Sequence, residues 1–392
     1  MGQAVKNESR ICPLAPGPWK EVPRYMRSRT IMAVGLTFML TTTGLAFYLI
    51  LPNPIGGIID PEKNPKEYTL DAAIVIDGDA NFAATALLEG WPGDGSPENP
   101  FIIDGLDILV GGGYIISISN TQASFTISNC NLTGWCYNTR YNGAGIYLEN
   151  VTNGEIVNNI CSRHSHGIIL YGSSSNTVFN NTCTDNIEGG GITLDNSDSN
   201  TVANNTCSNY GGICLFESDH NLVENNTVSG TWVGISLGHS DYNTISYNNC
   251  SSIMCGEATG IFLGESDSNT VSNNICNYNG HGISLESSDS NTVSNNICNH
   301  NEFDGIYLYD SGSNTVVNNT CNGNTFGIYI GGTCGWPNIM VDNICLDNTE
   351  NDISDESLSE VLLSTMFVGF LGFIGITIVG GLIVGNRVSK GE

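Results

Sequence analysis

Basic residues are scarce in this chain. Its 392 residues include 12 Lys and Arg against 39 Asp and Glu, for a formal net charge of −27. Residues 52–360 contain four basic and 36 acidic residues, which gives this segment a formal charge of −32. Nucleic-acid binding needs clustered Lys and Arg, so this composition excludes a nucleic-acid partner. It also disfavours polyanionic sugars without bridging cations, and it suits a surface solvated in salty surroundings.

The central region also lacks a helical period of hydrophobic residues. From Gly145 to Asp352 it repeats an approximate unit, G-I-x-L-x-x-S-D-x-N-T-V-x-N-N-x-C, at steps of 21 to 26 residues. Units of this size bury their apolar face by stacking on their neighbours. The nine copies begin at Gly145, Gly167, Gly191, Gly212, Gly234, Gly260, Gly282, Gly305 and Gly327.

The columns of the repeat predict strands. Ile follows the glycine in every copy, a Leu (Ile330 in the last copy) stands two positions later, and a Val or Ile recurs further on. Apolar residues two apart indicate a strand with one buried face, and the Gly, Ser, Asp and Asn between them form turns. Because parallel crossovers prefer one hand, we predict an all-β solenoid, a right-handed single-stranded parallel β-helix.

Asparagine occupies two further columns, nine and fourteen residues after the glycine. Asn tolerates the left-handed backbone of a tight corner, and amides stacked about 4.8 Å apart can hydrogen-bond from turn to turn. We therefore interpret both columns as structural ladders and not as sugar ligands.

The segments S-D-S-N-T-V-S-N-N-I-C at 266–276 and 288–298 resemble NosD-type β-helix repeats, a group within the carbohydrate-binding proteins and sugar hydrolases. The segment 90–105, which contains G-W-P-G-D-G and E-N-P-F-I-I, resembles one that opens many archaeal surface β-helix proteins. The resemblance covers about 70–352 and implies the pectate-lyase-like fold. It says little about activity, since such proteins include enzymes, binders and scaffolds.

Two uncharged apolar runs, 31–51 and 361–384, flank the repeats, and each is long enough to cross a bilayer. Basic residues before the first run and after the second predict cytoplasmic tails and an extracellular segment 52–360. A cleaved signal peptide is the alternative for the first run. The expected organisation is tail 1–30, transmembrane helix or signal anchor 31–51, linker 52–69, N-terminal cap and irregular turns 70–144, repeats 145–352, linker 353–360, transmembrane helix 361–384 and tail 385–392.

Cysteines recur sixteen residues after the repeat glycine in seven copies, and the copy that begins at Gly212 has Val228 there. A column that accepts Val or Cys indicates an apolar interior, where free Cys packs as a small hydrophobe. Disulfides between turns and a metal site are the alternative interpretations, while Cys136, Cys214, Cys255 and Cys334 are the better disulfide candidates. The column comprises Cys161, Cys183, Cys207, Cys250, Cys276, Cys298 and Cys321.

Seven N-x-S/T sequons predict glycosylation in an exported domain, although N-N-T is also the turn sequence of the repeat. They begin at Asn131, Asn150, Asn180, Asn204, Asn225, Asn249 and Asn318.

An acidic column stands seven residues after the glycine. Stacked carboxylates repel one another, so a Ca²⁺ ion between turns would stabilise them; an Asx-type turn is the other interpretation. A Ca²⁺-dependent lyase would also need a base near the column, and Arg163 belongs to an earlier copy. The column comprises Asp198, Asp219, Asp241, Asp267 and Asp289.

Two other chemistries have weak support. Gly280-His281-Gly282 matches the G-H-G of polygalacturonase-like hydrolases, but the Asp-Asp pair and the R-x-K element of those enzymes are missing. We place His281 in the loop before the repeat glycine. The NosD resemblance alone implies copper handling, for which His164 and His166 form the only close histidine pair.

Aromatic residues cluster in the last repeats, where they can form a ledge for stacking on sugar rings or fill the end of the solenoid. The candidates are Tyr307, Tyr309, Tyr329 and Trp336. We therefore expect a membrane-anchored cell-surface protein that binds glycans or serves as an envelope component beside other envelope proteins, without catalysis. A polysaccharide lyase or glycoside hydrolase on the same scaffold is the alternative.

Overall fold

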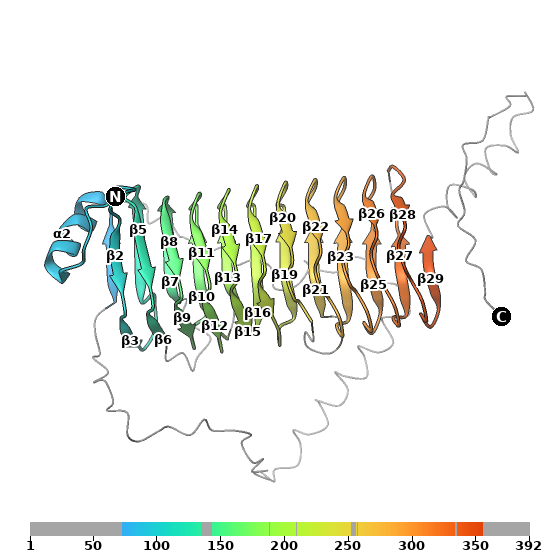
Figure 1. Ribbon diagram of the computed structural model, residues 1–392, viewed down its shortest axis with the longest axis horizontal. Coiled ribbons are helices and arrows are strands. Elements are labelled where there is room, and N and C mark those ends of the chain that lie inside the picture. The colour runs from blue at the N-terminus through green and yellow to red at the C-terminus, as the bar shows by residue number, and fades with distance from the viewer. Residues whose placement is uncertain are drawn as a thin grey trace, which may run out of the picture.

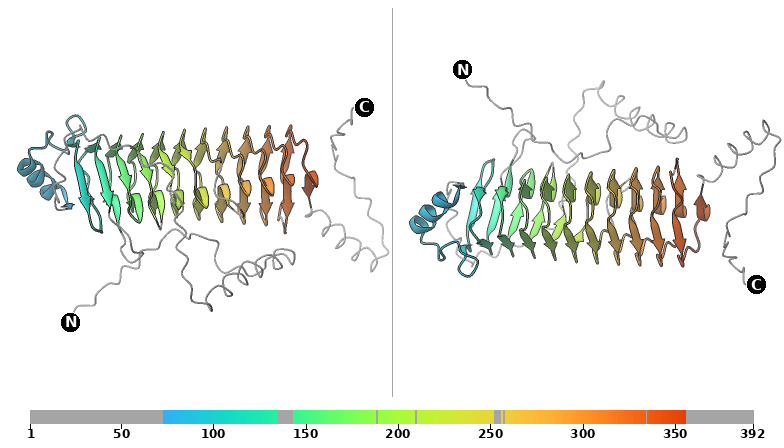
Figure 2. Two further views of the ribbon diagram at one scale, coloured as in Figure 1. Left: turned by 90° about the horizontal axis from the view of Figure 1, so that it is seen from below. Right: turned by 90° about the horizontal axis from the view of Figure 1, so that it is seen from above.

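The computed structural model describes residues 73–134, 143–187, 189–208, 210–251, 256, 258–333 and 335–355. These residues form a straight rod of stacked turns, with the first turn at one end and the last at the other (Figure 1). Strands line the long sides of the rod in both other views (Figure 2). In all three sheets, each strand is hydrogen-bonded to the equivalent strand of the adjacent turn, and the two strands run parallel. The predicted parallel β-solenoid is confirmed.

The first sheet has 12 strands and carries the G-I-x-L segments. Its strands are β1 (Ile74–Asp77), β4 (Ile116–Thr121), β7 (Ala144–Val151), β10 (His166–Tyr171), β13 (Gly190–Asp195), β16 (Gly211–Phe216), β19 (Val233–Gly238), β21 (Thr259–Gly264), β23 (His281–Glu286), β25 (Asp304–Tyr309), β27 (Phe326–Gly331) and β29 (Asn351–Asp355).

The second sheet has 11 strands and carries the T-V-x segments. Its strands are β2 (Phe101–Asp104), β5 (Phe125–Ser128), β8 (Gly154–Val157), β11 (Thr177–Phe179), β14 (Thr201–Ala203), β17 (Leu222–Glu224), β20 (Thr244–Ser246), β22 (Thr270–Ser272), β24 (Thr292–Ser294), β26 (Thr315–Val317) and β28 (Ile339–Val341).

The third sheet has six strands and then continues as single bridges at Asn249, Ile275, Ile297, Thr320 and Ile344. Its strands are β3 (Asp107–Val110), β6 (Asn131–Gly134), β9 (Ile160–Ser162), β12 (Thr182–Thr184), β15 (Thr206–Ser208) and β18 (Thr227–Val228).

One continuous core fills the interior of the rod. Most turns of the repeat contribute an Ile and a Leu from the first sheet, a Val or Ile from the second, and a Cys at the third-sheet position, nearly all of them fully buried. Equivalent residues pair in register, as Ile261 does with Ile283 and Val271 with Val293. Stacking thus buries the apolar column that one turn alone would expose.

Polar ladders line the corners of the rod. Between the second and third sheets, Asn248 donates from its backbone N–H (2.9 Å) and its Nδ2 (3.0 Å) to Oδ1 of Asn274 in the next turn. In the other Asn column, at the corner between the first and second sheets, the backbone N–H of Asn243 donates to Oδ1 of Asn269, while its Nδ2 donates to the carbonyl oxygen of Ser218. A buried serine ladder lies beside it, in which Ser240 N–H donates to Ser266 Oγ. Buried polar groups need such partners, and the predicted asparagine ladders are confirmed.

A short helix, α2 (Asp79–Glu89), lies at the N-terminal end of the rod (Figure 1). Its Phe82 is fully buried and stacks on Phe101, with ring centroids 4.7 Å apart. Gly90 ends the helix in the left-handed conformation, as C-terminal caps commonly do. The repeat pattern did not predict this helix, because it occurs once and outside the repeats.

Both predicted membrane spans, 31–51 and 361–384, lie outside the described residues. Within the described part of the chain, no helix is long and apolar enough to cross a membrane.

Candidate functional site

Aromatic rings gather on the outward face of the first sheet near its C-terminal end. Tyr307 of β25 and Tyr329 of β27 pair in register, and their rings stack with centroids 5.5 Å apart at an interplanar angle of 10°. Tyr309 lies parallel to Tyr307, with centroids 6.1 Å apart at 5°. Phe326 meets Tyr329 edge to face at 5.4 Å. We name these four residues the aromatic patch.

An imidazole and a carboxylate adjoin the aromatic patch. His281 begins β23, and its ring lies 5.3 Å from that of Tyr307 and 5.2 Å from that of Phe303. Its Nδ1 is 3.0 Å from Oδ2 of Asp304, and both side chains are largely buried. The geometry is not that of a hydrogen bond, so the attraction is electrostatic and depends on a protonated imidazole.

Glu286 completes this group, since it pairs in register with Tyr309. Burial raises the pKa of Glu286, and the neighbouring His281 partly opposes that rise. Burial also raises the pKa of Tyr307, and the Glu286 carboxylate adds to the effect. The site therefore offers ring faces bordered by a tyrosine hydroxyl, an imidazole and two carboxyl groups, which can stack on and hydrogen-bond to a polyhydroxylated ligand.

The sequence located part of this site. Tyr307, Tyr309 and Tyr329 come together, whereas Trp336 is 73% exposed at a neighbouring corner, where its carbonyl oxygen accepts the N–H of Ser313. The placement of His281 in a loop was wrong. Thr259 pairs with His281, so β23 begins one residue before the repeat glycine.

The sequence did not assign Glu286, Asp304 and Phe326 to this site, and it placed His281 in a loop and not beside the aromatic rings. These four residues occupy outward positions immediately before the repeat glycine or four residues after it. Aligning the copies by strand register, and not only by their interior residues, would have brought them together.

The predicted acidic column forms a ladder. Oδ1 of Asp198 accepts the N–H of Asp219 at 2.7 Å, and the pattern continues through Asp241, Asp267 and Asp289 to the N–H of Gly312. One oxygen of each carboxylate is thus engaged by the backbone of the next turn. Among the described residues, no group of three or more His, Cys, Asp or Glu side chains could hold a metal ion.

The two close histidines lie in different surroundings. His164 is fully buried, and its Nε2 lies 3.3 Å from the carbonyl oxygen of Leu132. His166 begins β10 and packs against Gly189 on the outward side. Burial lowers the pKa of both to about 4, and each Nδ1 lacks a hydrogen-bond partner among the described residues.

The structure places the seven predicted column cysteines in the core as free thiols, and Cys345 extends the column at its C-terminal end. At the N-terminal end Leu132 occupies the column and pairs with Cys161, whereas the buried Cys130 stands at the preceding corner, where its N–H donates to Oδ1 of Asn159. Burial and contacts between neighbouring thiols raise the pKa of Cys276 and Cys298. Cys214, on the outward side of β16, forms a disulfide. The other off-column candidates, Cys136, Cys255 and Cys334, lie outside the described residues.

Asparagines of the predicted sequons mostly face solvent. In an N-N pair, the second Asn builds the buried ladder and the first is exposed in the left-handed conformation, as Asn180 and Asn181 illustrate. Of the seven, Asn131 alone is half-buried; Asn150, Asn180, Asn204, Asn225, Asn249 and Asn318 are exposed.

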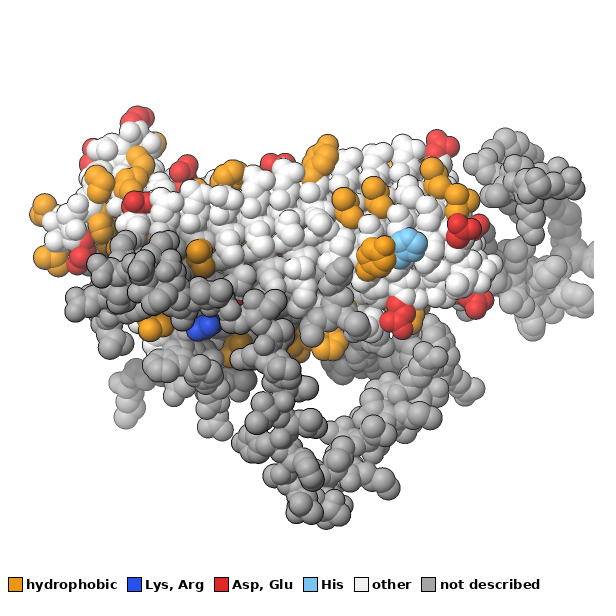
Figure 3. All heavy atoms as spheres, turned by 60° about the horizontal axis from the view of Figure 1, so that its bottom comes forward, with side chains coloured by type: hydrophobic (Ala, Val, Ile, Leu, Met, Phe, Trp, Pro, Cys, Tyr) orange, Lys and Arg blue, Asp and Glu red, His pale blue; other side chains and the backbone are white. Residues whose placement is uncertain are grey.

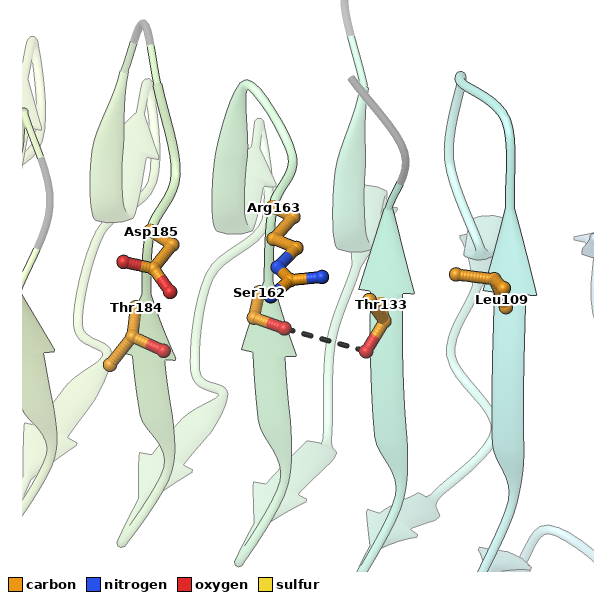
Figure 4. Close-up of a pocket in the computed structure, with 6 residues that line it drawn as sticks. All are labelled: Leu109, Thr133, Ser162, Arg163, Thr184 and Asp185. Atoms are coloured by element: carbon orange, nitrogen blue, oxygen red, sulfur yellow. Dashed lines mark hydrogen bonds between the residues drawn. The ribbon is translucent and has the colours of Figure 1, made fainter. Parts of the chain in front are cut away.

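Arg163 is the only Lys or Arg among the described residues. It lies after β9, on the third-sheet side of the rod and one turn from Asp185 (Figure 4), whereas the acidic ladder occupies the corner between the first and second sheets. Arg163 therefore does not adjoin the ladder as a lyase base would. One face of the molecule is drawn in Figure 3, where uncharged side chains and backbone predominate over basic groups.

Solved structures share this fold at low sequence identity. A double mutant of the periplasmic alginate epimerase AlgG aligns with a TM-score of 0.50 and 16% identity, over 70% of this chain and 84% of that one. Dettilon tailspike protein aligns with a TM-score of 0.50 and 15% identity, over 71% of this chain and 64% of that one. At such identities the likeness concerns the fold alone.

A comparison with curated proteins finds no match. A family model described as "Periplasmic copper-binding protein (NosD)" matches residues 116–302 and 250–360. Together these matches span more than half of the 392 residues, and the chain therefore belongs to the NosD family.

Proposed function

We propose that this protein binds glycans at the cell envelope and does not catalyse a reaction. The observation that carries the proposal is the in-register pair Tyr307–Tyr329, with Tyr309 parallel to Tyr307, on an outward sheet face. The partly exposed tyrosine rings of this cluster present apolar surface and hydroxyl groups to a sugar. Glu286, Asp304 and His281 supply polar groups beside those surfaces for sugar hydroxyls.

The periodicity of the rod supports a polymeric ligand. Successive strands of a sheet lie about 4.8 Å apart, so Tyr307 and Tyr329 present rings at nearly the repeat length of a sugar chain. A glycan that runs along the rod would then place consecutive residues over consecutive strands. The alginate epimerase AlgG, which acts on a polysaccharide, has the same fold.

Localisation is part of the proposal. The family is described as periplasmic, and we propose that the runs 31–51 and 361–384 anchor the chain, with residues 52–360 outside and the sequon asparagines available for glycosylation. The charge of −32 on that segment suits a solvated envelope component.

A glycan-array screen of the full-length protein tests the proposal, followed by titration of the best ligand. We expect Tyr307→Ala to weaken binding about five- to thirtyfold, since one lost stacking contact costs about 1–2 kcal/mol. Tyr242→Ala is the matched control, because Tyr242 is 58% exposed at a corner and stacks only on His220. Equal affinities of wild type and Tyr307→Ala would reject the aromatic patch as the binding surface.

A carbohydrate-active enzyme, a lyase or hydrolase, is the second candidate, and the His281–Asp304 pair beside Glu286 favours it. An imidazole oriented by a carboxylate is a common general base, and a carboxyl group with a raised pKa can act as an acid. The same array ligands, incubated with the protein and analysed for new reducing ends or unsaturated products, separate the two functions.

Metal binding has less support than glycan binding. Copper(I) favours exposed thiolates, thioethers and imidazoles, whereas the column thiols are buried and His164 and His166 lie in different surroundings. Ca²⁺ would find only the free oxygen of each carboxylate in the acidic ladder. The described residues therefore fit neither ion well.

A further inference from the structure

A shallow hollow of about 360 Å³ lies on the outward side of the third sheet, away from the aromatic patch. Figure 4 shows its lining side chains, which come from successive turns near the N-terminal end of the rod. This volume is at the lower end of the range for ligand sites and suits one sugar ring. The lining residues are Leu109, Thr133, Ser162, Arg163, Thr184 and Asp185.

Hydroxyl groups form a row across the hollow. Thr133 pairs in register with Ser162, and Ser162 with Thr184, so their outward hydroxyls follow one another at strand spacing. Thr133 Oγ1 and Ser162 Oγ are 3.4 Å apart, a long hydrogen bond that a ligand hydroxyl can replace. Leu109 continues the row in the preceding turn with an apolar side chain.

Arg163 supplies the positive charge of the hollow. Its side chain is exposed, and no ion pair joins its guanidinium to another described residue. Its backbone is left-handed, with φ 61°, at a corner position where other turns have Asp185, Gly230, Tyr278, His300 and Gly323. The corner accepts side chains of several kinds, so its backbone conformation does not require an arginine.

We propose that the hollow binds a single uronic acid residue. The sugar carboxylate pairs with the planar guanidinium of Arg163 through two parallel hydrogen bonds. Its hydroxyls exchange hydrogen bonds with Thr133, Ser162 and Thr184, and its apolar edge faces Leu109. This second site does not depend on glycan binding at the aromatic patch.

The surrounding charge limits the ligand to one carboxylate. Asp185 lies one turn from Arg163, and residues 52–360 carry a formal charge of −32. Carboxylates further along a polyuronate would meet this acidic surface without a second cation among the described residues. The site thus selects an isolated or terminal uronic acid and not a polyuronate.

Saturation-transfer NMR titrations of the full-length protein with glucuronate and with glucose test this site. We expect glucuronate to bind in the millimolar range and glucose at least tenfold more weakly, because a charge-assisted hydrogen bond separates the two. Arg163→Gln should lower the glucuronate affinity at least tenfold, and Asp185→Asn should raise it a few-fold. Tyr307→Ala should leave it unchanged, which separates this site from the aromatic patch.

Two results would overturn the proposal. One is equal affinity of the wild type for glucuronate and glucose; the other is unchanged glucuronate affinity in Arg163→Gln. Arg163 and Asp185 are exposed corner residues, so their substitution should leave the fold intact. Circular dichroism of Arg163→Gln and Asp185→Asn checks that each variant is folded.

Discussion

Replacing His164 with asparagine should remove a measurable part of the acid sensitivity of this protein. His164 occupies a corner column that is filled in later turns by Asn186, Asn279, Asn301 and Asn324. Its Nε2 faces the carbonyl oxygen of Leu132 as Nδ2 of Asn186 faces that of Cys161. The imidazole therefore stands in for a ladder amide, but its Nδ1 is buried without a partner among the described residues.

The size of the effect follows from the pKa of His164. Burial lowers it from 6.5 to about 4 in the folded chain, so the unfolded chain takes up a proton first as the pH falls. The corresponding stability is full above about pH 6.5 and is lost as the pH falls towards about 4. Proton linkage gives a loss of about 2 kcal/mol between about pH 7 and about pH 5.

Urea unfolding of the full-length protein at these two pH values measures the difference. Wild type should lose about 2 kcal/mol more than His164→Asn on acidification, while their stabilities at neutral pH should be similar. His300→Asn is the matched control, because His300 is exposed at a left-handed corner that Asn also tolerates. If His164→Asn keeps the acid sensitivity of the wild type, the proton-linkage explanation is refuted.

Two further predictions concern the interior. Asn274→Ala removes the buried acceptor of both the backbone N–H and the Nδ2 of Asn248 and should lower the free energy of unfolding by about 2–5 kcal/mol. The outward Ser272→Ala of the same turn should change it by less than about 0.5 kcal/mol, and similar losses in the two variants would contradict the ladder's role. A thiolate-selective reagent should not label Cys298 in the native protein at neutral pH, because burial raises the pKa of that thiol and excludes the reagent. Peptide mapping by mass spectrometry measures this, and rapid native labelling would show that the core opens.

The repeat made the interior predictable. An inward Ile, Val or Cys must recur in every turn for the core to be continuous, so columns such as Ile261–Ile283 can be read directly from the sequence. The asparagine corners were predictable for the same reason. Helix α2 was not, because it caps only one end and leaves no periodic trace.

The candidate site was only partly predictable because it consists of exceptions to the repeat. Tyr307 and Tyr329 stand out as large residues at one variable position, but Asp304 and Phe326 precede the repeat glycine, at a position that the repeat pattern does not assign to a strand. Their proximity depends on the strand register, which pairs Asp304 with Phe326. His281 was misplaced for this reason, since the strand begins one residue earlier than the interior pattern requires.

The direction of the hydrogen bonds has a mechanical consequence. In all three sheets the backbone bonds connect one turn to the next and so run along the long axis of the rod. When the two chain ends are pulled apart, the end turns should detach one at a time, because each end turn is held by a single turn-to-turn interface. Bending must instead stretch several ladders at once, so the rod is stiff sideways and yields from its ends.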